Sequence, residues 1–351
     1  MATDSFTKIA YKTLQQGKSI AGLAHKELSS RLMKIVSPGS DLNDFNLNKK
    51  LIIEIQQSMD DLREEDWKDS EEKIYPKKLL FDEPWIRYLM QYPKIWLDMP
   101  NTWERRKKQK NDDLPKTIEK EDYPNYYLRN FHHQTDGYLS DFSASIYDLQ
   151  VDILFNGSAN SMRRRILKPL KKGLENFDDR KNSSIKILDV ATGSGRTLKQ
   201  LRGAFPKEKI IGIDLSDSYL KEASRHISDL EGDLIELVQG NAENLPFEDN
   251  SLQAVTCVFL FHELPRTVRI KVLNEFYRVL EPGGTLVLAD SIQIIDSPNF
   301  INIMEGFYKN FHEPFYCDYI KDDIDSRMGE IGFNKIITKS FFMTKVWSAL
   351  K

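Results

Sequence analysis

Short, nearly uninterrupted apolar runs recur through the second half of the chain, separated by stretches in which apolar residues return every three or four positions. The runs are typical of strands buried on both faces, and the periodic stretches are typical of amphipathic helices. The pattern predicts strands at 185–190, 210–214, 235–239, 254–258 and 285–290. Helices are expected to begin near Gly195, Asp217 and Pro265. This alternation predicts an α/β fold, a Rossmann-like doubly wound sheet that is mostly parallel, with helices on both faces.

The first 120 residues follow a different, helical pattern. Apolar residues return at helical spacing across 5–36, and Ser37-Pro38-Gly39 ends that predicted helix. A second helix is expected over 49–63, and the charge-dense segment 103–121 predicts an exposed linker. We therefore expect an N-terminal helical extension over 1–120 and an α/β domain over 121–351.

Composition and charge narrow the choice of partners. The chain of 351 residues is 40% hydrophobic and 29% charged, and its formal net charge is -3. This profile is typical of a globular domain and predicts no nucleic-acid partner. No apolar stretch approaches the ~20 residues of a membrane span, so we expect no transmembrane segment, while peripheral membrane contact stays open. A cytoplasmic location is expected, and organelle stroma or matrix stays open.

Neither the cysteines nor the basic residues predict a specific binding or catalytic site. Cys257 and Cys317 lie in no metal-ligand spacing, so neither a disulfide framework nor a metal site is predicted. The basic residues Arg163, Arg164 and Arg165 begin a cluster that predicts a solvated helix face, with contact to anionic lipid or an acidic acceptor as the alternative.

A glycine-containing loop follows the first predicted strand. Residues 187–195 read ILDVATGSG, in which a buried strand runs into a turn that opens a helix. Gly193 and Gly195 let a ligand approach the main chain, at the sheet edge where doubly wound folds bind ligands. The third glycine of a dinucleotide fingerprint is absent, and Asp189 is a poor neighbour for a pyrophosphate. Asp189 suits a ligand that carries an ammonium and a sulfonium, such as S-adenosylmethionine.

Three polar or aromatic positions follow the next predicted strands. Asp214 ends the second strand, where a carboxylate can accept hydrogen bonds from ribose hydroxyls. Asn241 follows the third, where its side-chain carbonyl can accept from an adenine amino group. Phe259 follows the fourth, at the mouth of the expected site.

Four motifs in this order carry a family resemblance. DVATGSG, IIGIDLS, GNAENLPF and RVLEPGGTLVLAD, which lie between about residues 185 and 290, resemble the class I S-adenosylmethionine-dependent methyltransferases. They are most similar to the branch that includes the ubiquinone/menaquinone-biosynthesis C-methyltransferases. The resemblance implies S-adenosylmethionine as cofactor, and the C-terminal segments 332–337 and 342–349 fit the antiparallel hairpin typical of that fold.

The resemblance also implies roles for particular residues. Asp189, Gly193 and Gly195 would line the methionine end of the cofactor, Leu215 would pack on adenine, and Ala242 would join Asn241 at the adenine edge. Two positions depart from the family pattern. Ala191 replaces the first glycine and Asn241 replaces the more usual Asp, and both replacements are compatible with cofactor binding. The candidate cofactor-binding residues are Asp189, Ala191, Gly193, Gly195, Asp214, Leu215, Asn241, Ala242 and Phe259.

Two aromatic-rich segments flank the expected sheet and are candidates for an acceptor-side cap, 121–160 and 295–330. Both combine aromatic rings with histidines and carboxylates, as small-molecule pockets do. The alternative is that the rings form cap core and the histidines satisfy backbone groups. The candidate substrate-binding residues are Tyr127, Asp136, Tyr138, Tyr147, Phe311, His312 and Tyr316.

Methyl transfer requires alignment of the reactants and exclusion of water more than acid–base chemistry, so no catalytic triad is expected. His262 follows the fourth predicted strand and is a candidate general base, with Glu263 orienting it. A histidine that caps the next helix is the alternative. His132 and His133 are further catalytic candidates in the first aromatic segment.

The predicted function is transfer of a methyl group from S-adenosylmethionine to an oxygen or carbon of a small, aromatic or lipophilic acceptor. One alternative is an RNA or protein methyltransferase, against which the balanced charge argues. The other is a non-catalytic subunit that uses the fold as a platform for a partner, which the N-terminal extension motivates. The acceptor and the oligomeric state stay open.

Overall fold

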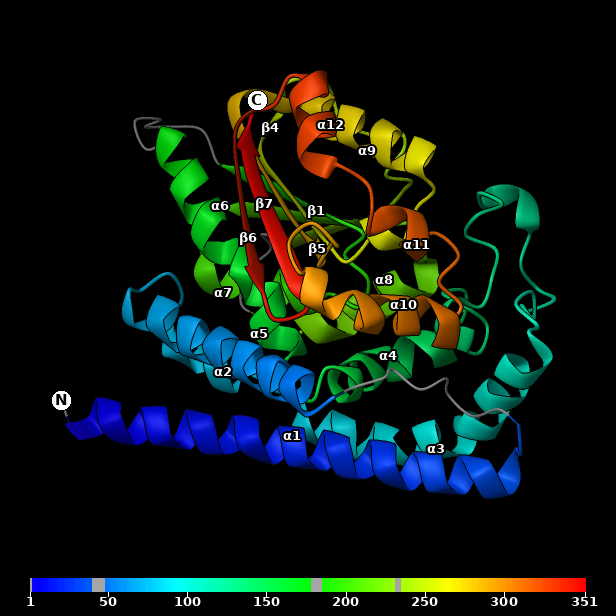
Figure 1. Ribbon diagram of the computed structural model, residues 1–351. Helices are drawn as coiled ribbons and strands as arrows, with labels where there is room; N and C mark the ends of the chain where they lie inside the picture. Colours follow the sequence, from blue (N-terminus) through cyan, green and yellow to red (C-terminus); the bar gives the residue numbers. More distant parts are fainter. Residues whose placement is uncertain (1, 40–47, 178–184, 231–234) are drawn as a thin grey trace.

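A seven-stranded sheet lies at the centre of the α/β domain in the computed structural model, which describes residues 2–39, 48–177, 185–230 and 235–351. The strand order is β3-β2-β1-β4-β5-β7-β6. Strands β1 to β5 run parallel, and β7 is antiparallel to both of its neighbours. The strands are β1 Lys186–Val190, β2 Lys209–Asp214, β3 Ile235–Gln239, β4 Leu252–Val258, β5 Leu280–Ser291, β6 Asn334–Phe341 and β7 Thr344–Leu350. The predicted doubly wound fold and its C-terminal hairpin are confirmed (Figure 1).

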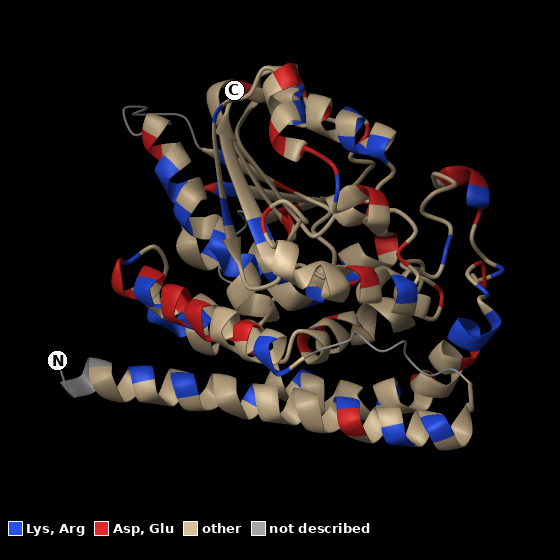
Figure 2. Cartoon of the chain, viewed as in Figure 1, with Lys and Arg blue, Asp and Glu red and all other residues tan. Residues whose placement is uncertain are grey.

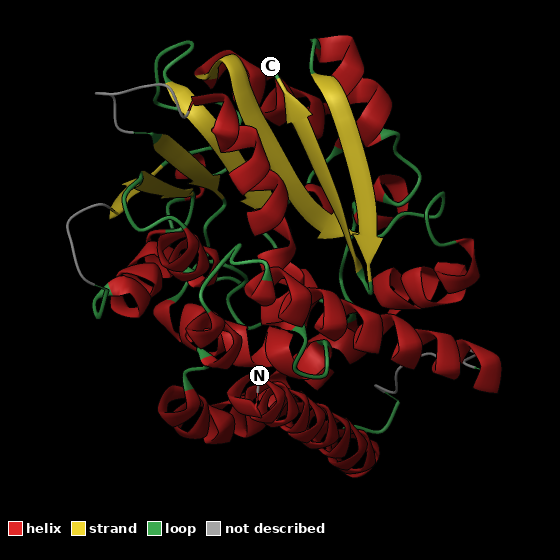
Figure 3. Ribbon diagram, turned by 90° about the vertical axis from the view of Figure 1, so that its left-hand side faces the viewer, coloured by secondary structure: helices red, strands yellow, loops and turns green. Residues whose placement is uncertain are grey.

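Helices cover both faces of this sheet (Figure 3). Helix α9, Arg266–Val279, and helix α12, Ile324–Ile331, share one apolar core with the sheet. Helix α6, Leu167–Leu174, and helix α7, Arg196–Ala204, share a second core on the opposite face. The central strands are mostly apolar because both of their faces are buried in this way. The remaining helices of the domain are α5 Ala159–Arg163, α8 Asp217–Ile227, α10 Ile301–Asn310 and α11 Tyr316–Tyr319.

A layer of long helices packs against one end of the sheet domain (Figure 1). It contains α1 Ala2–Val36, α2 Lys49–Glu71 and α3 Trp85–Lys108, and α4 Asp141–Leu154 lies between this layer and the sheet. The first predicted helix is confirmed, whereas the second is longer than its predicted end at residue 63. Figure 2 shows charged residues of both signs crowded along α2. Charge density alone suggests an exposed helix end there, but much of the last third of α2 is buried.

The predicted exposed linker over 103–121 is wrong in its first part. Helix α3 continues to Lys108, and Trp103 and Arg105 are buried. Arg105 Nε donates a hydrogen bond to the carbonyl oxygen of His133 at 2.9 Å. The basic run therefore belongs to a packed helix end, where cations also complement the helix dipole.

The predicted solvated basic face is wrong for its arginines, although Lys171 and Lys172 of the same cluster are exposed. Arg164 and Arg165 are each 2% exposed, and both bind the fully buried carboxylate of Asp66 on α2. Arg164 Nη2 lies 2.6 Å from Asp66 Oδ2, and Arg165 Nη2 lies 2.5 Å from Asp66 Oδ1. Arg165 also reaches Asp69 at 2.7 Å. These contacts tie the helical layer to the sheet domain.

Large apolar side chains remain exposed on the outer helices. On α1 and α3 they include Phe6, Ile20, Ile86, Leu89 and Leu97. Charged residues interrupt both helices, and none of the described helices combines the length and the apolar character that crossing a bilayer requires.

Candidate functional site

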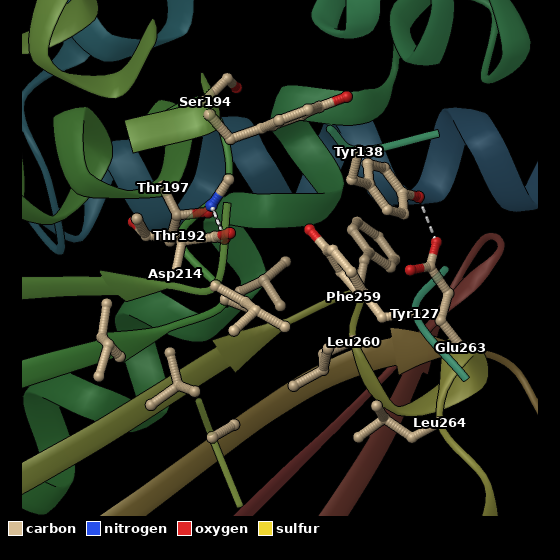
Figure 4. A pocket seen from close by; sticks show the side chains of 18 of the residues that line it. Tyr127, Tyr138, Thr192, Ser194, Thr197, Asp214, Phe259, Leu260, Glu263 and Leu264 are labelled. Atoms are coloured by element: carbon tan, nitrogen blue, oxygen red, sulfur yellow. Dashed lines mark hydrogen bonds between the residues drawn. The ribbon is translucent and has the colours of Figure 1, made fainter. Parts of the chain in front are cut away.

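A pocket opens at the carboxyl ends of β1, β2 and β4, where the strand order reverses around β1 (Figure 4). Parallel sheets of this kind bind ligands at such a switch point. The wall is built by the loops that follow these strands and by side chains of the segment before the sheet. Predicted cofactor residues that line the pocket are Ala191, Gly193, Asp214, Leu215, Asn241, Ala242 and Phe259.

The loop after β1 has an unusual backbone. Ala191, Gly193 and Gly195 all have positive φ, at 55°, 54° and 82°. A side chain at Gly195 would place its Cβ 2.9 Å from Ala223 of α8, so this position requires glycine for packing as well as for its φ. Ala191 adopts the left-handed region at modest cost because its side chain is small. The loop can therefore present its main chain to a ligand.

Asp214 joins this loop to the end of β2. Its Oδ2 accepts from the backbone N–H of Gly193 at 2.8 Å, and its Oδ1 accepts from the N–H of Ser216 at 2.9 Å. Burial raises the pKa of this carboxyl, while the backbone donors oppose the increase. Figure 4 shows the Asp214 carboxylate at the pocket wall with its bond to the loop.

Asp189 does not line the pocket, contrary to the expectation that it faces the ligand. Its carboxylate is 1% exposed and accepts from the hydroxyls of Thr192 and Thr256, both at 2.7 Å. Burial raises the pKa of Asp189 to about 7, against the effect of these two donors. Gly195 likewise lies behind the wall, where it packs against α8. Asp189 and Gly195 therefore fix the conformation of the loop through contacts on the side away from the pocket.

Tyrosines close the other end of the pocket. The predicted residues Tyr127, Tyr138 and Tyr147 line it, joined by Tyr126 and by Tyr219 of α8. The ring of Tyr138 lies 5.8 Å from that of Tyr147 and 5.4 Å from that of Tyr219, both edge to face. Sequence reasoning missed Tyr219, although its place one turn into the helix after Asp214 was a usable signal. Other lining residues that it missed include Tyr126, Arg163, Thr192, Ser194, Arg196 and Thr197.

Beside this tyrosine end lies a buried group of two histidines and two glutamates. His132 precedes α4, His262 and Glu263 follow β4, and Glu313 lies between α10 and α11. One ligand atom of each residue lies within 4.8 Å of all the others. His132 Nε2 contacts Glu313 Oε1 and lies 3.7 Å from Glu263 Oε1, while His262 Nε2 lies 3.9 Å from the same Glu263 oxygen. Three of these residues were predicted as catalytic, and Glu313 was missed.

The predicted orientation of His262 by Glu263 is wrong. His262 Nδ1 binds Asp290 Oδ1 at 2.7 Å, and Asp290 Oδ2 accepts from the backbone N–H of Phe261 at 2.7 Å. Burial alone lowers the pKa of His262, but the charge of Asp290 and its hydrogen bond, together with Glu263 and Glu313, raise it to about 10. A histidine that holds its proton this firmly is a poor general base at neutral pH. Glu263 instead accepts from the hydroxyl of Tyr138 and lines the pocket (Figure 4).

The remaining candidates lie outside the pocket lining. The rings of His133 and His312 pair with each other at 6.2 Å, apart from the histidine–glutamate group. Tyr316 is buried, with its hydroxyl 2.6 Å from Ser291 and its ring 6.0 Å from that of His262. Asp136 adopts a positive φ in a turn, and Phe311 packs on Phe307. The segment 295–330 therefore packs around the residues that line the pocket and contributes none of the lining residues itself.

Comparison with known proteins agrees with this geometry. Residues 187–284 match the model of a family described as a methyltransferase domain. A demethylmenaquinone methyltransferase of Oceanobacillus iheyensis is 37% identical over 125 residues, which are 35% of this chain and 50% of that protein. One of Bacillus cereus is 33% identical over 127 residues, 36% of this chain and 51% of that protein. The chain thus spans about half the length of the curated relatives that it matches. These matches confirm the predicted resemblance.

Among solved structures, human N-acetylserotonin methyltransferase in complex with S-adenosylmethionine aligns with 60% of this chain and 56% of its own. The TM-score is 0.46 and the sequence identity is 14%, too low for the alignment to add to the argument from strand order and motifs.

Proposed function

We propose that this protein transfers a methyl group from S-adenosylmethionine to an oxygen or carbon of a small aromatic or lipophilic acceptor. The observation that carries the proposal is one pocket with two unlike ends. The glycine loop and Asp214 form one end, and buried tyrosines with Glu263 form the other. The family match over 187–284 supports the transfer of a methyl group.

The first end suits the donor. The Asp214 carboxylate lies at the tip of β2, where it can accept from ribose hydroxyls, and Leu215 and Ala242 offer apolar contacts to an adenine ring. Asn241 Oδ1 already accepts from the N–H of Glu243 at 2.9 Å, and its second lone pair remains for an adenine amino group. Asp214 and Glu263 on two sides of the pocket favour a ligand with a sulfonium charge.

The second end suits an aromatic or lipophilic acceptor. Burial raises the pKa of Tyr127 and Tyr138 well above the usual value, so both hydroxyls stay protonated and neutral. Rings with a few hydroxyls and one carboxyl make a largely apolar wall with fixed polar points. The demethylmenaquinone methyltransferases among the relatives support an acceptor related to a quinone. In this proposal 121–160 and 295–330 form the acceptor-side cap, and 1–120 cover it from outside.

Binding of S-adenosylhomocysteine, measured by calorimetry, tests the donor site. We expect the wild type to bind and Asp214→Ala to bind about 10- to 100-fold more weakly, since it loses charge-assisted hydrogen bonds. Asp217→Ala is a matched control three residues later, because its side chain is 57% exposed and its ion pair is with Lys221 on the same helix. Circular dichroism would show whether Asp214→Ala keeps its fold. A folded wild type without affinity for the donor or its product would refute the proposal.

Methyl transfer itself is tested with hydroquinones and phenols as trial acceptors. We expect a mass increase of one methyl group on at least one of them, dependent on S-adenosylmethionine. Binding of the donor together with failure of every small acceptor would contradict the acceptor class and retain the donor site.

A further inference from the structure

We propose that His132, His262, Glu263 and Glu313 bind a divalent first-row transition-metal ion beside the tyrosine end of the pocket. Imidazole nitrogens and carboxylate oxygens together are the ligand set of Zn²⁺, Fe²⁺ and Mn²⁺ sites. Two carboxylates neutralise a double positive charge, and metal binding would release the Nε2 proton of His262 to solvent, so that both histidines bind as neutral rings.

The spacing of the four residues fits one ion. Their ligand atoms lie within 4.8 Å of one another. Ligands about 2.1 Å from a metal on opposite sides of it are about 4.2 Å apart, so small shifts bring all four atoms into coordination distance. Among the described parts of the chain, no other group of three or more histidine, cysteine or acidic residues converges in this way.

Several ligand atoms lack the partners that buried polar atoms require. Glu313 has a fully buried side chain, and neither of its oxygens makes a hydrogen bond within the described chain. His132 Nε2 is likewise buried without a hydrogen bond, although it lies against Glu313 Oε1. Glu313 Oε2 has neither a hydrogen bond nor an ion-pair partner among the described residues, and a buried polar atom without a partner is costly. A cation shared with His132 would supply that partner.

An outer partner prepares His262 for the metal. Asp290 holds the Nδ1 side of the ring at 2.7 Å, which leaves Nε2 directed to the group. Carboxylate–histidine pairs of this kind orient the ring and raise its basicity in metal sites. Asp290 is itself held by the N–H groups of Phe261 and Ser291, so the arrangement is built into the end of β5. Asp290 is therefore a positioning residue.

The place of the ion follows from Glu263, which belongs both to this group and to the pocket lining. An ion there would lie beside the acceptor, where it could hold an acceptor oxygen. The role of the ion in holding an acceptor oxygen rests on the proposed function, whereas binding of the ion itself does not.

The test is calorimetric titration of the full, untagged protein, stripped of metal with a chelator, with Zn²⁺. Parallel titration with Co²⁺ would report nitrogen and oxygen ligands through its visible absorption. We expect one ion per chain, and at least 10-fold weaker binding for Glu313→Gln, which keeps the shape of the side chain but removes its charge. Asp290→Asn should weaken binding about 10- to 100-fold through loss of ring orientation.

His133→Gln is the matched control, because His133 is adjacent in sequence to His132 but pairs with His312 outside the group. It should bind Zn²⁺ as the wild type does. Absence of stoichiometric binding by the wild type would overturn the inference, as would equal affinities for the wild type and a folded Glu313→Gln. S-adenosylhomocysteine binding, measured on the same samples, separates the proposals. If the protein binds S-adenosylhomocysteine but no metal, only the proposed metal site is refuted. If it binds metal but no S-adenosylhomocysteine, only the proposed donor site is refuted.

Discussion

Two buried clusters of charged residues differ in how many hydrogen-bond and ion-pair partners their carboxylates have. Asp66 on α2 accepts from Arg164, Arg165, Tyr11, Tyr75 and Ser161. Glu313 is as deeply buried, yet its oxygens take no hydrogen bond from the described residues. The first cluster carries its own cations, and the second has carboxylates in excess of them.

How far its carboxylates are paired distinguishes a structural cluster from a candidate binding site. A buried carboxylate with two guanidinium partners is stable as it stands and holds two regions of the chain together. Glu313 contacts only the His132 ring among the described residues, and burial raises its pKa well above the usual value, so this carboxyl either holds a proton or needs a bound cation. Asp189 is intermediate, since two threonine hydroxyls and no cation contact its oxygens.

Asp66→Ala should have the largest effect on stability. It leaves Arg164 and Arg165 buried without their main partner, and removal of one member of a buried pair costs about 3–5 kcal/mol. Denaturant unfolding should show this loss in the free energy of unfolding. Asp60→Ala is a control on the same helix, because the Asp60 side chain is 57% exposed and forms an ion pair with Arg63 one turn away. It should cost less than about 1 kcal/mol. Equal effects of the two substitutions would break the comparison.

Asp189→Asn should change how stability depends on pH. The folded protein holds a proton on Asp189 up to about pH 7, whereas the unfolded chain releases it near the usual value of 3.8. Stability from this group is therefore present below the unfolded pKa and falls as pH rises to about 7, by up to ~4 kcal/mol at 1.36 kcal/mol per unit. Unfolding midpoints measured between these pH values should decline less in the variant. An unchanged slope would show that Asp189 ionises normally.

The pKa of Asp66 is shifted in the opposite direction to that of Asp189, so its effect on stability has the opposite dependence on pH. Burial raises its pKa, but the charges of Arg164 and Arg165 and the hydrogen bonds from Arg164 and Tyr75 lower it below the usual value. Its contribution is present above the unfolded pKa and is lost only as pH falls through the lower folded pKa. Unfolding midpoints measured below pH 3.8 should reveal this loss, and Asp66→Ala should lack it.

Glu313→Gln should have the smallest effect on stability, within about 1 kcal/mol when no metal is added, because Gln keeps the shape of the side chain and can keep the contact with His132. With Zn²⁺ present the wild type should gain stability and the variant should gain less, as measured by thermal unfolding. A loss in the metal-free variant as large as that of Asp66→Ala would show that Glu313 is a structural partner after all.

Local patterns in the sequence were sufficient for the sheet and for several residues that line the pocket. Strand β3 has its predicted bounds, and α8 begins at the predicted Asp217, where the Ser216 side chain caps the helix. The glycine loop and Asp214 were found because each lies at the end of a predicted strand. Asn241 also lies where it was expected, on the pocket wall.

The sequence by itself determined the elements, their order and the donor motifs, because each depends on residues a few positions apart. Tertiary structure alone decided which charges are paired. Arg164 reads as a surface residue until α2 brings Asp66 to it, and Asp189 reads as a ligand contact until two threonines enclose it. Glu313 joins His132 only because the segment after β5 folds back over the segment before α4. Burial and pairing of charges depend on contacts between distant segments, and no local periodicity records those contacts.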